Sequence, residues 1–201
     1  ASSTAVYGPS EEYSDEPLTH DAPLKPRSHY GFYKQANEGT AQVYFRDDGV
    51  SSIGLRPYVV YGAGRDQGMT STPTKAILAA AAGNSYHISY GGRYCFQYAD
   101  DTARAFIQSA RAEFTGAEVY NIGGDSVSTA EVIEAIEKAE PSALGKITFD
   151  DVPLPFPAEV KNRALMDAIG NLAFTSLADG VSETLSIFLS AITESKIKPE
   201  A

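Results

Sequence analysis

The feature that most constrains the fold is the alternation of strand-like and helix-like segments, separated by glycine and proline. Residues 52–62 are rich in β-branched and aromatic side chains, which indicates a strand. Residues 72–82 predict a helix that stops at Gly83. Two short strands around a Gly-Gly turn are expected in 86–99, and another strand at 118–122. Elements that alternate in this way are typical of an α/β protein with a parallel sheet.

Four more helices are predicted. Residues 28–48 have a helical composition, and Ser128-Thr129-Ala130-Glu131 has the spacing of a capping box at the start of a helix. A helix capped by Asp101 and a last helix from about Leu177 each have an apolar face. These two faces comprise Ala103, Phe106, Ile107 and Ala110 in the first helix, and Val181, Leu185, Phe188, Leu189 and Ile192 in the second.

Composition excludes several classes of protein. With 26 Asp and Glu against 16 Lys and Arg among 201 residues, the formal charge is −10, which repels nucleic acid and anionic membrane surfaces. The longest apolar stretch, 76–82, is far shorter than a membrane span, and the start of the chain has no signal-peptide pattern. We therefore expect a cytoplasmic protein. A lone Cys95 and scattered histidines (His20, His29 and His87) predict no metal site.

Tyr30 and Lys34 form the first candidate for chemistry. A spacing of four residues places both side chains on one face of the predicted helix. An ammonium group next to a phenol favours the phenolate form, which a general acid or base acting on an alcohol or ketone needs. Alone the pattern is weak, because twelve tyrosines in the chain make chance matches common.

Two further segments are candidates because each has a strand pattern that ends in glycine. In Ser3-Thr4-Ala5-Val6-Tyr7-Gly8, residues 4–6 are predicted to be the end of a strand, where open α/β sheets place their ligands. The Ser3 hydroxyl could there hydrogen-bond a substrate oxygen. The other segment is Leu55-Arg56-Pro57-Tyr58-Val59-Val60-Tyr61-Gly62.

In this order and at these separations, the three motifs resemble the extended short-chain dehydrogenase/reductase family, the NAD-dependent epimerase/dehydratase group. Three other segments support the resemblance, which spans nearly the whole chain: Phe96-Gln97-Tyr98-Ala99-Asp100-Asp101, Tyr120-Asn121-Ile122-Gly123-Gly124 and Ser176-Leu177-Ala178-Asp179-Gly180-Val181. It implies the C-terminal part of a Rossmann-type parallel sheet with helices on both faces, plus a small α+β substrate-binding lobe. The remainder of the Rossmann domain would comprise 1–62 and parts of 100–125, and the lobe 63–99 and 126–201.

The resemblance also implies a catalytic triad of Ser3, Tyr30 and Lys34. Tyr30 would move the hydroxyl proton during hydride transfer to a nicotinamide, and Lys34 would hold the nicotinamide ribose. The strand end at Pro57, Tyr58 and Val60 would lie against the nicotinamide, so that the implied cofactor is NAD or NADP.

Substrate positions are implied in the same way. Thr4 follows the triad serine where dehydratases of the group carry Asp, which disfavours dehydration. Val59 occupies a slot in which members acting on nucleotide sugars have Asn, and Tyr94, next to Arg93, occupies the place of a diphosphate-binding Arg. A free sugar or sugar acid is therefore an option beside a nucleotide sugar. Arg65 and Gln67 could supply an anion contact instead.

The family's Gly-x-x-Gly-x-x-Gly turn does not occur in these 201 residues, and the sequence starts Ala1-Ser2 without Met. We expect about 110 residues with the cofactor half to precede this segment in a complete enzyme. We expect that enzyme to be a homodimer, and the 201 residues alone to be inactive. The alternative is a non-catalytic substrate-binding or interaction fragment. Epimerase, dehydrogenase and reductase activities are not separated by the sequence.

Overall fold

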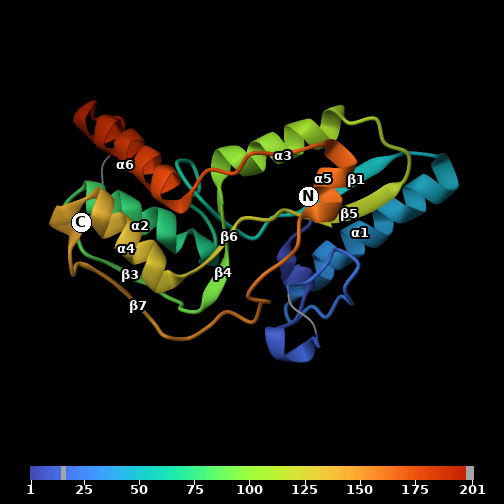
Figure 1. Cartoon of the computed structure of the whole chain (residues 1–201), viewed down its shortest axis with the longest axis horizontal. Coiled ribbons are helices and arrows are strands. Elements are labelled where there is room, and N and C mark those ends of the chain that lie inside the picture. Colours follow the sequence, from blue (N-terminus) through green and yellow to red (C-terminus); the bar gives the residue numbers. More distant parts are fainter. Residues whose placement is uncertain (15–16, 198–201) are drawn as a thin grey trace. The chain divides into compact units, whose positions relative to one another are not determined.

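The computed structural model describes residues 1–14 and 17–197, where it contains six α-helices and seven β-strands (Figure 1). The helices are α1 (His29–Asp48), α2 (Thr72–Ala81), α3 (Ala99–Arg111), α4 (Thr129–Ala139), α5 (Arg163–Ile169) and α6 (Leu177–Thr193). The strands are β1 (Ser52–Arg56), β2 (Val59–Tyr61), β3 (Tyr86–Ile88), β4 (Arg93–Tyr98), β5 (Ala117–Asn121), β6 (Asp125–Ser128) and β7 (Ile147–Phe149). The predicted α/β class is confirmed.

The chain forms two compact units. Unit 1 comprises residues 1–58, 101–124 and 155–173, and unit 2 comprises 59–100, 125–154 and the residues from 174 onward. Assignment of a cofactor role to one part and a substrate role to the other stays a prediction.

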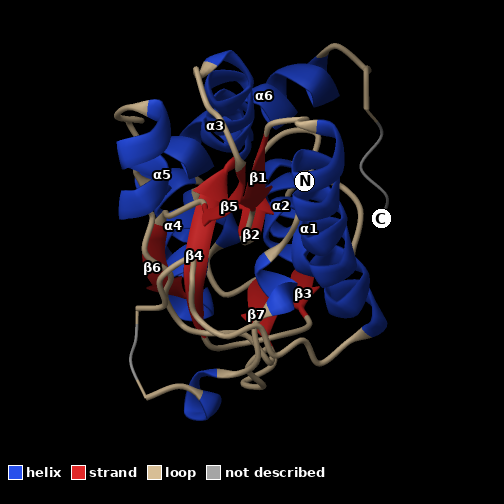
Figure 2. Cartoon of the chain, turned by 90° about the vertical axis from the view of Figure 1, so that its right-hand side faces the viewer, coloured by secondary structure: helices blue, strands red, loops and turns tan. Residues whose placement is uncertain are grey.

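Unit 1 is built on the parallel pair β1 and β5, in which Ser52 lies opposite Ala117 and Arg56 opposite Asn121. The backbone N–H groups of Ser2 and Thr4 donate to the carbonyl oxygens of Leu55 and Pro57, so the first residues run parallel beside β1. Figure 2 shows α1 and α5 on different sides of these two strands.

The predicted strand end at residues 4–6 is wrong. Thr4–Val6 is a 3-10 turn, η1, whose first residues are capped by the Ser3 side chain. The Ser3 Oγ accepts from the Ala5 N–H at 3.2 Å, and this local bond competes with extension of the strand. Strand-like pairing with β1 therefore ends at Thr4.

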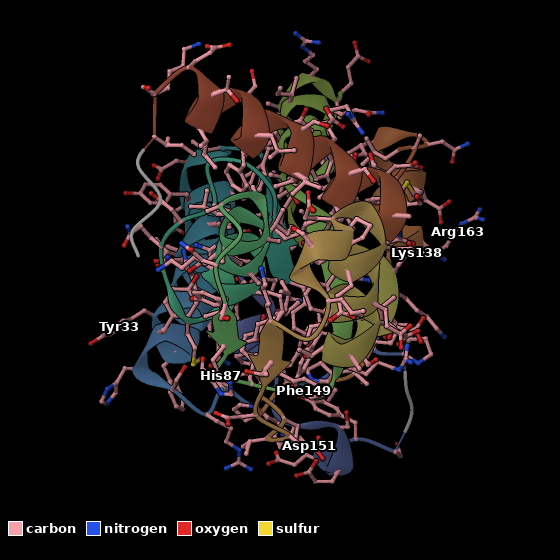
Figure 3. All side chains as sticks on the ribbon, turned by 90° about the vertical axis from the view of Figure 1, so that its left-hand side faces the viewer. Tyr33, His87, Lys138, Phe149, Asp151 and Arg163 are labelled. Atoms are coloured by element: carbon pink, nitrogen blue, oxygen red, sulfur yellow. The ribbon has the colours of Figure 1, made fainter. Side chains whose placement is uncertain are left out.

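Unit 2 has a three-stranded sheet in which β4 is parallel to β2 and antiparallel to β6. A second, two-stranded sheet pairs β3 with β7 in parallel. Helices α2, α4 and α6 pack against one another. Figure 3 shows His87 and Phe149 close together on the β3 and β7 side of this unit, where the His87 Nε2 lies 3.1 Å from Asp150 Oδ1.

The predicted strand 52–62 is divided in two. Pro57 has no N–H to donate to a ladder, and the chain leaves β1 there to enter β2 in the other sheet. The two strands expected in 86–99 exist as β3 and β4, but they pair with other strands rather than with each other. The strand β6, which follows Gly123-Gly124 and precedes α4, was not predicted.

The buried faces of two helices differ from the expected ones. In α3 the buried residues are Asp101, Thr102, Ala105 and Ser109, whereas Ala103, Ile107 and Ala110 of the predicted apolar face are exposed. Asp101 is not a cap, because α3 begins at Ala99, and its carboxylate accepts from Arg104. In α6 the stripe is buried at Val181 and Leu185, while Leu189 is exposed.

Two further observations concern the described residues 1–14 and 17–197. None of the helices there has the length and apolar character that crossing a membrane requires. The same residues hold no cluster of three or more His, Cys, Asp or Glu side chains suited to a metal ion. Cys95 is buried on β4.

Candidate active site

Helix α1 carries the candidate acid or base. The Ser28 Oγ caps the helix by accepting from the Gly31 N–H at 3.1 Å, and Gly49, with φ of 69°, ends it. Tyr30 and Lys34 lie one turn apart, and the Lys34 Nζ is 5.4 Å from the centroid of the Tyr30 ring. Tyr30 is 54% exposed, so the residue is accessible to a ligand.

The third predicted residue, Ser3, lies in the segment that α1 contacts. The Lys34 Nζ donates to the carbonyl oxygen of Ala1 at 3.1 Å, two residues before Ser3. Gly31 packs so closely against the carbonyl of Ala5 that a Cβ at this position would overlap it. Unit 1 thus places Ser3, Tyr30 and Lys34 on two segments that are in direct contact.

Beneath these residues lies a buried polar network. Glu38, one turn after Lys34 in α1, accepts from the Ser2 hydroxyl and from the guanidinium of Arg56. Arg56 Nη1 also donates to the Tyr7 hydroxyl at 2.6 Å. The Tyr7 hydroxyl in turn donates to Asn121 Oδ1 at 2.8 Å. Each of these five side chains is buried.

Burial and neighbouring charges have opposite effects on the pKa values of Tyr7 and Arg56 in this network. Burial raises the pKa of Tyr7, and the nearby Arg56 charge only partly offsets it, so the phenol stays protonated and can donate to Asn121. Burial acts to lower the pKa of Arg56, but the hydrogen bonds and charge of Glu38 outweigh that effect and keep the pKa above its ordinary value. Arg56 is therefore a permanent cation in this site.

The other predicted residues of unit 1 are largely engaged within it. Thr4 is buried and its hydroxyl donates to the carbonyl of Pro57 at 3.3 Å. The Tyr58 hydroxyl donates to the carbonyl of Pro157, and its ring packs edge-on against Phe156 at 6.1 Å. Pro57 is half-buried.

The remaining candidates belong to unit 2. Val59 is fully buried and Val60 half-buried in β2. The Arg65 guanidinium donates to the carbonyl of Gln67 and, at 3.2 Å, to Thr70 Oγ1, so Arg65 and Gln67 share one loop.

Arg93 and Tyr94 lie side by side on β4 but point into different surroundings. The Arg93 guanidinium donates to the carbonyl of Ser126 at 2.5 Å and to Glu131 Oε2 at 2.6 Å. Tyr94 is buried and donates to the carbonyl of Gly91 at 2.7 Å. Both side chains thus already have protein partners.

The sequence did not reveal the roles of Glu38, Arg56, Tyr7 and Asn121. One local signal was present: Glu38 continues the spacing of four residues that starts with Tyr30 and Lys34. A second signal was Arg56, which directly follows Leu55 at the end of β1, because a buried arginine needs a charged partner.

Comparison with known proteins identifies the family to which this chain belongs. The sequence pattern of the NAD dependent epimerase/dehydratase family matches residues 1–123. The chain belongs to this family, and its fold is of the Rossmann type.

Individual proteins resemble the chain in sequence or in fold. An uncharacterized 37.6 kDa protein of Escherichia coli O111:H- is 32% identical over 207 residues, which covers 90% of this chain and 59% of the relative. A UDP-N-acetylglucosamine 4-epimerase from Methanobrevibacter ruminantium M1, solved with UDP-N-acetylmuramic acid, has a TM-score of 0.80 at 25% identity, over 94% of this chain and 61% of that one. A partial consensus L-threonine 3-dehydrogenase has a TM-score of 0.81 at 23% identity, over 94% and 64% respectively. The chain thus spans about three-fifths of the length of proteins that it resembles.

Proposed function

We propose that this chain carries the catalytic Ser-Tyr-Lys part of an NAD(P)-dependent epimerase or oxidoreductase. Its substrate would be a sugar, a nucleotide sugar or a sugar acid, and the reaction would take place at a hydroxyl group of that molecule. The observation that supports this most directly is the arrangement of α1, which presents an accessible Tyr30 with the Lys34 ammonium 5.4 Å from its ring, beside the segment that holds Ser3.

In the proposed reaction the chain's own residues move a proton and orient the substrate. The Tyr30 phenolate takes the proton of the substrate hydroxyl as the carbinol carbon loses a hydride, and it returns a proton when a carbonyl is reduced. The Lys34 ammonium favours the phenolate form of its neighbour. The Ser3 hydroxyl donates a hydrogen bond to the substrate oxygen.

The chain has donors that suit one end of a dinucleotide. Tyr30 is exposed and Lys34 half-buried on α1, and the hydroxyl and ammonium groups are donors suited to ribose oxygens. The bound cofactor would supply a hydride acceptor and donor. The glycine-rich turn that holds a pyrophosphate does not occur in the 201 residues: after Gly62 and Gly64 the chain reaches the start of α2 only at Thr72. These residues therefore fit the nicotinamide end alone, and the choice of NAD or NADP stays open.

Substitution of Tyr30 by Phe tests the proposal in the polypeptide as its source makes it. Tyr30→Phe should lower kcat by at least about 100-fold, because it removes the transferable proton. Tyr33→Phe is the matched control, since Tyr33 lies on the same helix, is 69% exposed and extends away from the ribbon (Figure 3). Net NADH formation would identify a dehydrogenase, whereas an epimerase regenerates its cofactor. Equal turnover by the two variants would exclude the proposed role of Tyr30.

The alternative function is a non-catalytic substrate-binding or interaction fragment. In that case a sugar-type ligand should bind with unchanged affinity to Tyr30→Phe, and the native polypeptide should form no NADH.

We also propose that the protein assembles as a homodimer. The exposed side of α1 carries the aromatic side chains of Phe32 and Tyr44, each more than half exposed, and exposed aromatic side chains of this kind are typical of a protein interface. Replacement of Phe32 and Tyr44 by Asp should convert a dimer into a monomer in sedimentation velocity, with the single substitution Asn37→Asp, at an exposed position of the same helix, as control.

A further inference from the structure

Helix α1 is attached to unit 1 by unusual means. Over its 20 residues the buried positions are Gly31 and Glu38, and neither contributes an apolar side chain. A helix normally docks through an apolar stripe. The most deeply buried contacts of α1 are instead a close backbone approach at Gly31 and the carboxylate of Glu38, beside the half-buried Ala41 and Phe45.

Three contacts at helical spacing connect α1 to the first residues of the chain. Gly31 packs on Ala5, the Lys34 Nζ donates to the carbonyl of Ala1, and Glu38 accepts from the Ser2 hydroxyl. The opposite edge of the same segment is hydrogen-bonded to β1 through the N–H groups of Ser2 and Thr4, at 2.8 and 3.1 Å. Ser3 lies between these two anchored residues.

Arg56 completes the anchor. Its Nε and Nη2 donate to the two carboxylate oxygens of Glu38, each at 2.8 Å, and its Nη1 donates to the Tyr7 hydroxyl and to the carbonyl of His20, each at 2.6 Å. Glu38 therefore accepts three hydrogen bonds, two from Arg56 and one from Ser2. Both ends of the segment 2–7 are thus tied to one guanidinium–carboxylate pair.

The Glu38 carboxylate can orient its neighbours, which an apolar side chain at this position could not do. Buried ion pairs are poor sources of stability, because desolvation of the charges offsets much of their attraction. A carboxylate does impose direction, since its oxygens fix the positions of the donors that bind them. The donor adjacent to the proposed catalytic Ser3 is Ser2.

On the basis of the proposed function, we infer that Glu38 is a positioning residue that holds Ser3 in register with Tyr30 and Lys34 through Ser2 and Arg56. It acts on the reaction through the backbone of residues 2–4 and does not itself contact substrate. Its effect on turnover is therefore transmitted through the Ser3 hydroxyl.

A double-mutant cycle between Glu38→Gln and Ser3→Ala tests this inference in the polypeptide as its source makes it. Glutamine keeps the size of the side chain but places an NH₂ group against Arg56 or Ser2, which are donors. Glu38→Gln should lower kcat per folded molecule by about tenfold or more, with KM changed less than about twofold. On the Ser3→Ala background the same change should lower kcat less than about twofold. The hydroxyl that Glu38 is proposed to position is then absent, so the effects of the two substitutions on kcat are not additive.

A purely structural role for Glu38 would give a different pattern. The loss of kcat would then be the same fold-change in both backgrounds, and that result would overturn the inference. Ser2→Ala is the second variant: it removes one hydroxyl, leaves the Glu38–Arg56 pair, and should show the same dependence on Ser3. Glu118→Gln, at an exposed position of β5, is the matched control and should leave kcat unchanged.

The outcomes separate this inference from the proposed function. Turnover that survives Tyr30→Phe overturns the proposed function, and the positioning role with it. Additive losses at Glu38 and Ser3, together with an inactive Tyr30→Phe, overturn the positioning role alone.

Discussion

Arg56 and Glu38 form a two-point ion pair in unit 1, in which Nε and Nη2 each lie 2.8 Å from a different carboxylate oxygen. The two side chains are only 4% and 7% exposed. One residue ends β1 and the other lies on α1, one turn after Lys34. This pair therefore fixes the register of the candidate catalytic helix against the sheet.

Removal of one partner of this pair should be strongly destabilising. Arg56→Met leaves the Glu38 carboxylate buried without its cation, and we expect the free energy of unfolding to fall by about 3–5 kcal/mol. The double variant Arg56→Met/Glu38→Leu buries no charge and should recover most of that loss. Urea denaturation of the two variants checks this expectation. If Arg56→Met were as stable as the unmodified protein, the Arg56–Glu38 pair would not be needed to hold α1.

Two glycines of α1 differ in how closely the backbone of residues 1–5 approaches them. A Cβ on Gly31 would overlap the carbonyl of Ala5, whereas a Cβ on Gly39 has no heavy atom within 4 Å. Gly39→Ala should stabilise the protein by about 0.5–1 kcal/mol, the difference in helix propensity between the two residues. Gly31→Ala should destabilise it, because α1 must move away from residues 1–5. Thermal unfolding of both variants measures the difference, and a Gly31→Ala variant that is as stable as the unmodified protein, or more stable, would contradict the close approach at Gly31.

The bounds of several helices could be predicted because their ends have local signals. Gly83, with φ of 74°, follows α2, and Ser128 and Glu131 form the capping box that was predicted for α4. The Tyr-x-x-x-Lys pair was recognisable for the same reason, since its geometry depends only on helical spacing. The seven-residue α5 and the three-residue β7 were missed, because such short elements have too few residues to show a period.

Which face of a helix is buried could not be predicted for α1 and α3. Periodicity shows which residues share a face, but a buried polar face is stable when its groups are paired, as Glu38 is with Arg56 and Asp101 with Arg104. These partners are distant in the sequence or hidden within the same turn. The Tyr7–Asn121 bond joins residues that are 114 positions apart, and no local pattern indicates it.

The capping box of α4 predicts a specific dependence of stability on pH. The N–H and the hydroxyl of Ser128 donate to Glu131 Oε2, each at 2.7 Å, and together with Arg93 they lower the pKa of Glu131. A carboxyl group whose pKa is lower in the folded state stabilises that state above its unfolded pKa, and this contribution is lost as the pH falls through the folded value.

The difference in free energy of unfolding between the unmodified protein and Glu131→Gln should therefore be constant from pH 7 to about 5, then shrink towards zero below about pH 4. Ser128→Ala should lower the free energy of unfolding by about 0.5–2 kcal/mol at neutral pH, because the cap is lost. Glu134→Gln, on the exposed side of α4, is the matched control for the loss of one charge. Urea denaturation across this pH range provides the measurement. If Glu131→Gln and Glu134→Gln changed stability equally at every pH, the hydrogen bonds from Ser128 would not favour the charged form of Glu131.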